Sequence, residues 1–174
     1  MVKSNDGKLH HLIVGSRVFY PSHGVGLVAG IEEREFGHEK QIFYVLELDR
    51  GVKVLLPRSK IAQAGVRELV TATKARELLE KVRTEPANKA DLRTDHAARK
   101  ERAATYADGL RSGSADRYTA ILQELLFRSR TMRLSPSEQQ TLETARSFFV
   151  GEIGAALKRS PATVEADLLA EAEP

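Results

Sequence analysis

The stretch FYPSHGVGLVAGIEER, residues 19–34, decides the fold of the first part of this chain. Pro21 fixes φ and lacks an amide hydrogen, so it ends the short β run 17–20. The following Ser-His-Gly allows the chain to reverse, which makes His23 a turn residue rather than a ligand. A longer β run, 25–34, contains Gly26 and Gly30, and glycines inside a strand are typical of bends or bulges that close a small barrel.

Two more β runs follow this stretch. A connection at 36–40 leads into the run 41–48, and a turn at 49–51 leads into the run 52–56, which Pro57 ends. Several short strands with glycine-containing turns between them predict a small antiparallel β-barrel.

From about residue 71 the apolar residues recur with the period of a helix. The clearest start signal is Ser135 as N-cap, Pro136 at the first helical position and Glu138 three residues after the cap. Ser160 and Pro161 repeat the signal for a last helix. The pattern lapses between 85 and 102, which indicates a connection followed by an alanine-rich helix at about 95–110. The fold class is therefore α+β, a barrel followed by an all-α domain.

The composition limits the possible classes of protein. The chain of 174 residues has no cysteine, so thiolate metal sites, disulfides and thiol nucleophiles are excluded. It has no apolar run near the ~18 residues of a membrane helix and no apolar signal segment, so we expect a soluble, cytoplasmic protein that contacts no membrane. The net charge of +3 permits contact with nucleic acid without requiring it.

The sequence offers no catalytic, metal or cofactor motif. The five histidines show no metal-ligand spacing. No nucleophile elbow, phosphate-binding loop or dinucleotide fingerprint is present. We therefore expect no catalytic residues, no metal and no cofactor.

Two surfaces remain as candidates. Alternation in 52–57 places Lys53, Leu55 and Pro57 on one face, so Leu55 is either an exposed docking residue on an edge strand or part of a barrel that buries both faces. The densest basic patch is Arg99, Lys100 and Arg102, with Lys89 and Arg93 before it. These cations either meet phosphates without reading bases or form a solvated helix start.

The order and spacing of these features resemble the CarD/CdnL family of bacterial transcription regulators. The resemblance spans about residues 12–170 and rests on these segments: 18–21, 23–26, 30–34, 43–46, 55–57, 65–69, 113–114, 134–138, and 145–152. It implies a lead-in at 1–12 that is disordered, a Tudor-like RNA-polymerase-interacting domain at 13–70, a helical DNA-contacting domain at 71–170 and an acidic tail at 171–174.

The resemblance also implies partners and site residues for a protein that is not an enzyme. The barrel is expected to dock on the β subunit of RNA polymerase, and the residues carried over for this contact are Arg34, Val45, Leu55 and Pro57. The helical domain is expected to contact promoter DNA without sequence specificity and weakly by itself, and so to modulate the stability of the open promoter complex. The residues expected at the DNA are Arg93, Arg99, Lys100 and Arg102.

One feature of the family is missing. Its members usually carry a tryptophan that wedges into the minor groove, whereas this chain has no tryptophan and Arg99 at the equivalent position. An arginine can enter a narrow groove or hold a phosphate, but it cannot unstack a base step. The alternative is a protein–protein adaptor of the same fold whose helices never touch DNA.

Overall fold

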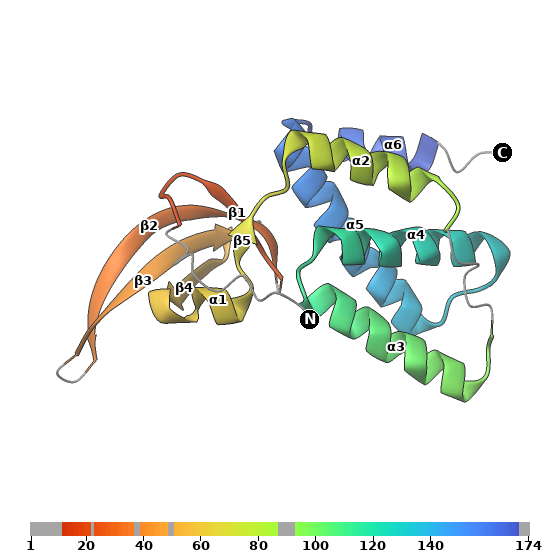
Figure 1. Cartoon of the computed structure of the whole chain (residues 1–174), viewed down its shortest axis with the longest axis horizontal. Helices are drawn as coiled ribbons and strands as arrows, with labels where there is room; N and C mark the ends of the chain where they lie inside the picture. The colour runs from red at the N-terminus through yellow and green to blue at the C-terminus, as the bar shows by residue number, and fades with distance from the viewer. Residues whose placement is uncertain (1–11, 22, 37–38, 49–50, 87–92, 171–174) are drawn as a thin grey trace, which may run out of the picture.

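The computed structural model describes residues 12–21, 23–36, 39–48, 51–86 and 93–170. An antiparallel β domain is followed by a set of helices, which confirms the predicted α+β class (Figure 1). The lead-in up to residue 11 and the acidic tail 171–174 lie outside the described residues, as do His10, His11, His38 and Lys89.

One five-stranded antiparallel sheet has the strand order β4-β3-β2-β1-β5. The strands are β1 (Arg17–Tyr20), β2 (Gly24–Phe36), β3 (Glu39–Leu48), β4 (Lys53–Pro57) and β5 (Arg67–Glu68). Of the two glycines expected at bends or bulges, Gly30 is confirmed, because the register between β2 and β3 shifts between Val28 and Gly30. The expectation for Gly26 is wrong, because it pairs in regular register with Val18 and Leu48. The predicted connection at 36–40 is too long, because Phe36 already pairs with Glu39 and Glu35 with Lys40.

The barrel core lies on one face of this sheet and includes Ile61 of α1 (Ile61–Ala64), which directly follows η2 (Arg58–Lys60). These two short turns were not expected from the sequence, because four residues are too few for a helical period to be visible. The buried members of this core are Leu12, Val18, Val28, Tyr44, Leu46, Leu56, Ile61 and Val66.

The helical domain contains α2 (Ala72–Arg83), α3 (His96–Arg111), α4 (Ala115–Thr131), α5 (Pro136–Leu157) and α6 (Pro161–Ala170). The start predicted for α5 is confirmed as a capping box: the Ser135 amide donates to Glu138 Oε2 at 2.9 Å, and the Glu138 amide donates to Ser135 Oγ at 3.3 Å. These reciprocal bonds satisfy amide groups that a helix start otherwise leaves without partners.

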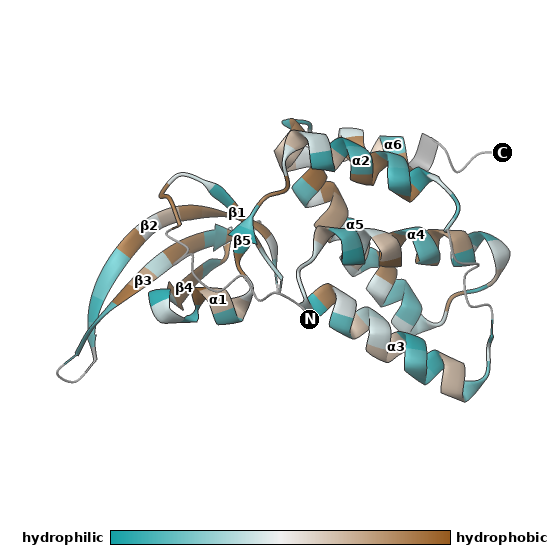
Figure 2. Ribbon diagram, viewed as in Figure 1, coloured by the Kyte–Doolittle hydropathy of each residue, from teal (hydrophilic) through white to brown (hydrophobic). Residues whose placement is uncertain are grey.

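The opening stretch of the barrel also forms the contact between the two domains. Phe19 lies in the helical core, where its ring stacks on Tyr118 at 5.6 Å and meets the edge of Phe148 at 5.2 Å. Pro21 packs so closely on Gly113 that a Cβ atom there would lie 2.5 Å from Pro21 Cγ, and Gly113 has a φ of 65°. Figure 2 shows apolar residues along the linker into α2 and on the adjoining part of α5.

A buried carboxylate completes this contact. Glu152 on α5 is fully buried and pairs with Arg67 of β5 through two bonds of 2.5 and 2.8 Å. It also accepts hydrogen bonds from the Tyr118 hydroxyl at 2.6 Å and from the Val70 amide at 2.8 Å. Burial, together with the Glu152 charge, raises the pKa of Tyr118 well above its usual value, so the hydroxyl stays protonated as a donor. The barrel and the helices are therefore joined by a dense polar and aromatic interface.

Candidate functional site

The register of the sheet places the expected docking residues on one face. Val45 and Leu55 are direct cross-strand partners, and Pro57 lies opposite Phe43, two positions from Val45. Arg34 of β2 lies opposite Gln41 of β3, and Gln41 precedes Phe43 by two positions, so it points to the same side as Phe43 and Val45. Because paired residues point to the same side of a sheet, these side chains share the face opposite the barrel core. We call the face formed by Arg34, Val45, Leu55 and Pro57 the outer face.

The outer face adjoins a sheet edge. Strand β4 is terminal in the strand order, and within the described part of the chain it pairs only with β3. Of its residues, Leu56 is buried in the core whereas Leu55 is only half-buried, which favours the first of the two interpretations of this strand. An edge strand beside apolar side chains can accept an extended segment of a partner as an additional strand.

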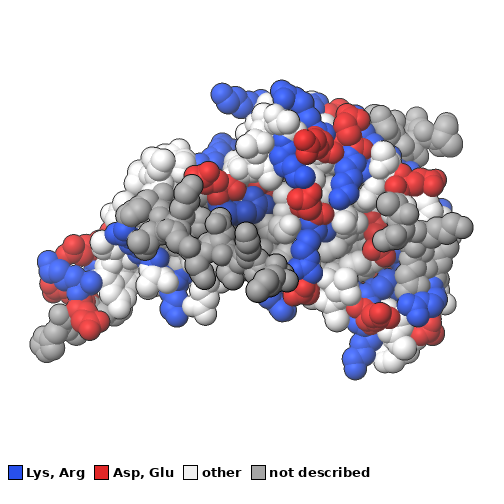
Figure 3. Space-filling view, viewed as in Figure 1, with Lys and Arg blue, Asp and Glu red and all other residues white. Residues whose placement is uncertain are grey.

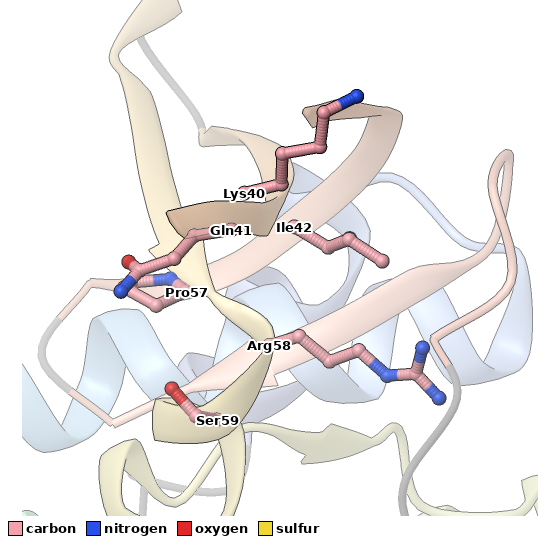
Figure 4. A pocket seen from close by; sticks show the side chains of 6 residues that line it. All are labelled: Lys40, Gln41, Ile42, Pro57, Arg58 and Ser59. Carbon is pink, nitrogen blue, oxygen red and sulfur yellow. The ribbon is translucent and has the colours of Figure 1, made fainter. Parts of the chain in front are cut away.

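A cavity of about 450 Å³ lies at the end of β4, where the β2–β3 hairpin extends beyond it. Its lining is Lys40, Gln41, Ile42, Pro57, Arg58 and Ser59, and Figure 4 shows Ile42 and Arg58 extending to one side while Gln41 and Pro57 extend to the other. Ile42 is 38% exposed and Ile31, on the same hairpin, is 53% exposed. Ile42 and Arg58 were not expected at this site from the sequence. The sequence did contain a signal for Ile42, because Pro57 ends the neighbouring strand β4. Pro57 pairs with Phe43, so Ile42 has no partner among the described residues of β4.

Arg34 lies at the polar end of the outer face. Its guanidinium donates to Glu32 Oε2 through Nη2 at 2.8 Å and Nε at 3.1 Å, and the two side chains are 47% and 45% exposed. Exposed ion pairs of this kind contribute only about 0–1 kcal/mol. A partner carboxylate can therefore replace Glu32 at little cost.

Three of the four expected DNA contacts are exposed. Arg99 and Lys100 lie on the first turns of α3, which Asp95 caps by accepting a bond from the Ala98 amide. Arg93 precedes the helix and pairs with Glu101 at 3.5 Å. Figure 3 shows lysines and arginines interleaved with acids over the helical domain, without one continuous basic surface on this side.

Arg102 does not fit the role expected from the sequence. It is 6% exposed, donates from Nη1 to the Arg93 carbonyl at 2.9 Å and pairs with Glu138 at 3.4 Å. Arg128, 1% exposed, pairs with the same Glu138 oxygen at 3.0 Å. A guanidinium held inside the helical domain in this way does not protrude to the backbone phosphates of a DNA duplex, so the structure supports a structural role for Arg102 and not the expected DNA contact.

Glu138 is stabilised in its charged form by these neighbours. Burial by itself raises its pKa, but hydrogen bonds from the Ser135 amide and hydroxyl, with the charges of Arg128 and Arg102, outweigh burial and lower the pKa below its ordinary value. The carboxylate is thus both a helix cap and the counter-ion of two buried arginines.

Two kinds of site are not found among the described residues. That part of the chain contains no group of three or more His, Cys, Asp or Glu side chains that could hold a metal ion. None of its helices combines the length and hydropathy needed to cross a membrane. Of the histidines, His23 is exposed beside Tyr20, with ring centroids 5.0 Å apart, and its amide closes the turn by donating to the Tyr20 carbonyl at 2.9 Å.

The architecture and the outer face define the class of protein, a Tudor-like β domain joined to a helical domain. Comparisons with known proteins agree with it. Residues 12–70 match the CarD-like/TRCF RID domain, and residues 88–169 match the CarD C-terminal domain. The Bacillus subtilis (strain 168) protein named "Putative transcription factor YdeB" is 24% identical over 141 residues, which cover 80% of this chain and 88% of that protein. The chain belongs to the CarD-like family of transcription regulators.

Proposed function

We propose that this protein regulates transcription by docking on the β subunit of RNA polymerase through its barrel and placing its helical domain against promoter DNA. The observation that carries this proposal is the outer face: Arg34, Val45, Leu55 and Pro57 share one sheet face beside the β4 edge. The family match supports the same assignment.

Docking combines strand pairing with apolar contact. The edge of β4 that has no strand partner among the described residues supplies main-chain hydrogen bonds, which give affinity for any extended segment. Val45, Leu55 and Pro57 add apolar area, and Arg34 exchanges its exposed partner Glu32 for an acidic group of the polymerase. Specificity then comes from the side chains on the outer face, because backbone pairing is the same for every sequence.

The DNA contact is made by Arg93, Arg99 and Lys100 and does not read bases. Each neutralised phosphate adds roughly 0.9 to the slope of log affinity against log salt, so the contact weakens steeply as salt rises. Without a tryptophan wedge, the protein stabilises melted promoters less than a tryptophan-bearing relative does. The polar and aromatic interface between the domains keeps the DNA-facing helix at a fixed place relative to the docked barrel.

The docking proposal is tested by capturing the polymerase β lobe with wild-type protein and with Leu55→Glu. The substitution places a charge on the half-buried outer face, so we expect capture to be lost while the fold is kept. Ala120→Glu, an exposed change on α4, is the matched control and should capture normally. Capture by Leu55→Glu equal to that of the control contradicts the docking surface.

The burial of Arg102 favours a second candidate, an adaptor whose helices do not touch DNA, because it removes one of the expected DNA contacts. Titrating promoter DNA across a range of salt concentrations, with polymerase present, separates the two. A salt-dependent contribution of this protein to DNA binding supports the first candidate, and its absence supports the adaptor.

A further inference from the structure

A second cavity lies in the helical domain, where the start of α3, the end of α4 and the start of α5 meet. Its volume is about 320 Å³, at the lower end of the range for small-molecule sites. Figure 1 shows this region at the end of the helical domain that points away from the barrel. Its lining includes these polar residues: Arg99, Arg102, Arg128, Arg133, Ser135 and Glu138.

The inner part of this cavity is made of buried charged groups. Arg102 and Arg128 are 6% and 1% exposed and share Glu138 Oε1. The other carboxylate oxygen, Oε2, accepts from the amide and the hydroxyl of Ser135 at 2.9 and 2.8 Å. Both oxygens of Glu138 are therefore engaged by the protein itself, and the carboxylate is held in place as part of the cavity wall.

Two further arginines line the cavity at exposed positions, which we call its rim, and they are not paired with Glu138. Arg99 and Arg133 are both exposed, and across the described ranges neither side chain makes an ion pair or a hydrogen bond. Among the described residues that line this cavity there are four guanidinium groups and one carboxylate. The start of the 22-residue helix α5 adds the positive end of a helix dipole. All these terms favour an anion.

We propose that this cavity binds the terminal phosphate or diphosphate of a small phosphorylated molecule. Guanidinium groups form paired hydrogen bonds with phosphate oxygens, and Arg99 and Arg133 are placed to close on the ligand from the rim. A terminal phosphate can enter a recess whose inner wall holds buried arginines. A phosphodiester in the backbone of a duplex reaches only protruding side chains, so a small ligand fits the recess better.

The ligand would also affect the DNA contact, an extension that rests on the proposed function. Arg99 belongs both to the cavity rim and to the proposed DNA-facing group. A bound phosphate would neutralise it and remove one cation from the DNA contact. Ligand binding itself does not depend on DNA or on polymerase, so the two proposals can fail separately.

The test is isothermal titration calorimetry of the full chain with inorganic pyrophosphate at fixed ionic strength. The variants are Arg99→Gln, Arg133→Gln and the double substitution, with Arg76→Gln, an exposed arginine of α2, as the matched control. A short DNA duplex is titrated in a parallel arm. Circular dichroism shows whether each variant is folded. Both rim substitutions lie at exposed positions and leave the buried pairs with Glu138 intact.

We expect saturable binding of pyrophosphate that weakens about tenfold or more for each rim variant and is unchanged for Arg76→Gln. The proposal is overturned if no saturable binding is seen at millimolar pyrophosphate, or if the double variant binds like the wild type. Equal weakening by Arg76→Gln also overturns it, because binding then follows net charge alone. If Arg133→Gln weakens binding of the DNA duplex while pyrophosphate does not bind at all, the rim arginines contact DNA and the proposal is wrong.

Discussion

Arg67 and Glu152, 85 residues apart in the chain, form a two-bond ion pair that joins the barrel to the helices, with donor–acceptor distances of 2.5 and 2.8 Å. Glu152 is completely buried, and Arg67 also lies 4.5 Å above the Phe19 ring. A buried carboxylate requires such partners, because removing it from water without them is very unfavourable. The pair therefore helps to fix the position of the barrel relative to the helical domain.

Removing one partner of this pair should destabilise the protein strongly. We expect Arg67→Ala to lower the free energy of unfolding by about 3–5 kcal/mol, because it leaves a buried charge without its main counter-ion. The measurement is urea denaturation monitored by circular dichroism. Arg34→Ala breaks the exposed pair with Glu32 and should cost no more than about 1 kcal/mol. Equal effects of the two substitutions would show that the interdomain pair has no special role.

The stability should depend on pH through Glu138. Its pKa is lower in the folded protein than its ordinary value, so its stabilising contribution is fully present above the ordinary glutamate pKa of about 4.3 and is lost as pH falls through the lower folded value. The difference in unfolding free energy between wild type and Glu138→Gln should therefore shrink as pH is lowered from 7 into this acidic range. Glu143→Gln, an exposed change on the same helix, should show no such trend. A difference that stays constant with pH contradicts the assignment.

Gly113 should not tolerate a side chain. Alanine there would adopt an unfavourable positive φ and place its Cβ 2.5 Å from Pro21 Cγ, so we expect Gly113→Ala to lower stability by more than about 1 kcal/mol. The melting temperature checks this. Gly30→Ala, where no atom lies within 4 Å of an added Cβ, should change the stability by only about 0.5 kcal/mol. Equal melting temperatures for Gly113→Ala and Gly30→Ala would contradict the close packing of Pro21 on Gly113.

If the helical domain contacts promoter DNA as proposed, a tryptophan at position 99 should stabilise open promoter complexes. Arg99→Trp supplies a flat apolar ring that can unstack a base step, so the lifetime of open promoter complexes should increase. Arg99→Gln instead removes one phosphate contact, and the slope of log affinity against log salt should fall by about 0.9. Open-complex lifetimes and salt titrations with polymerase present measure both. No gain from Arg99→Trp would mean that this position does not face the bubble edge.

The sequence by itself determined the local structure, because strand and helix signals depend on neighbouring residues. The capping box at Ser135 and the bulge at Gly30 were readable from spacing and residue type, whereas the alternation in 52–57 left open whether Leu55 lies outside the core. It also indicated that 19–34 is a structural segment and not a ligand loop, although it gave no sign that Phe19 and Pro21 form the contact between domains.

Only the tertiary structure decided which charged residues are available at the surface. Arg99 and Arg102 are three positions apart on one helix, yet the first is exposed and the second is buried against Glu138. A charge pattern along the chain does not show what packs over it, because the partner comes from a helix 36 residues away. The same physics applies to Arg67 and Glu152: whether a charged residue serves a ligand or the fold depends on long-range packing, which arises only when the chain has folded.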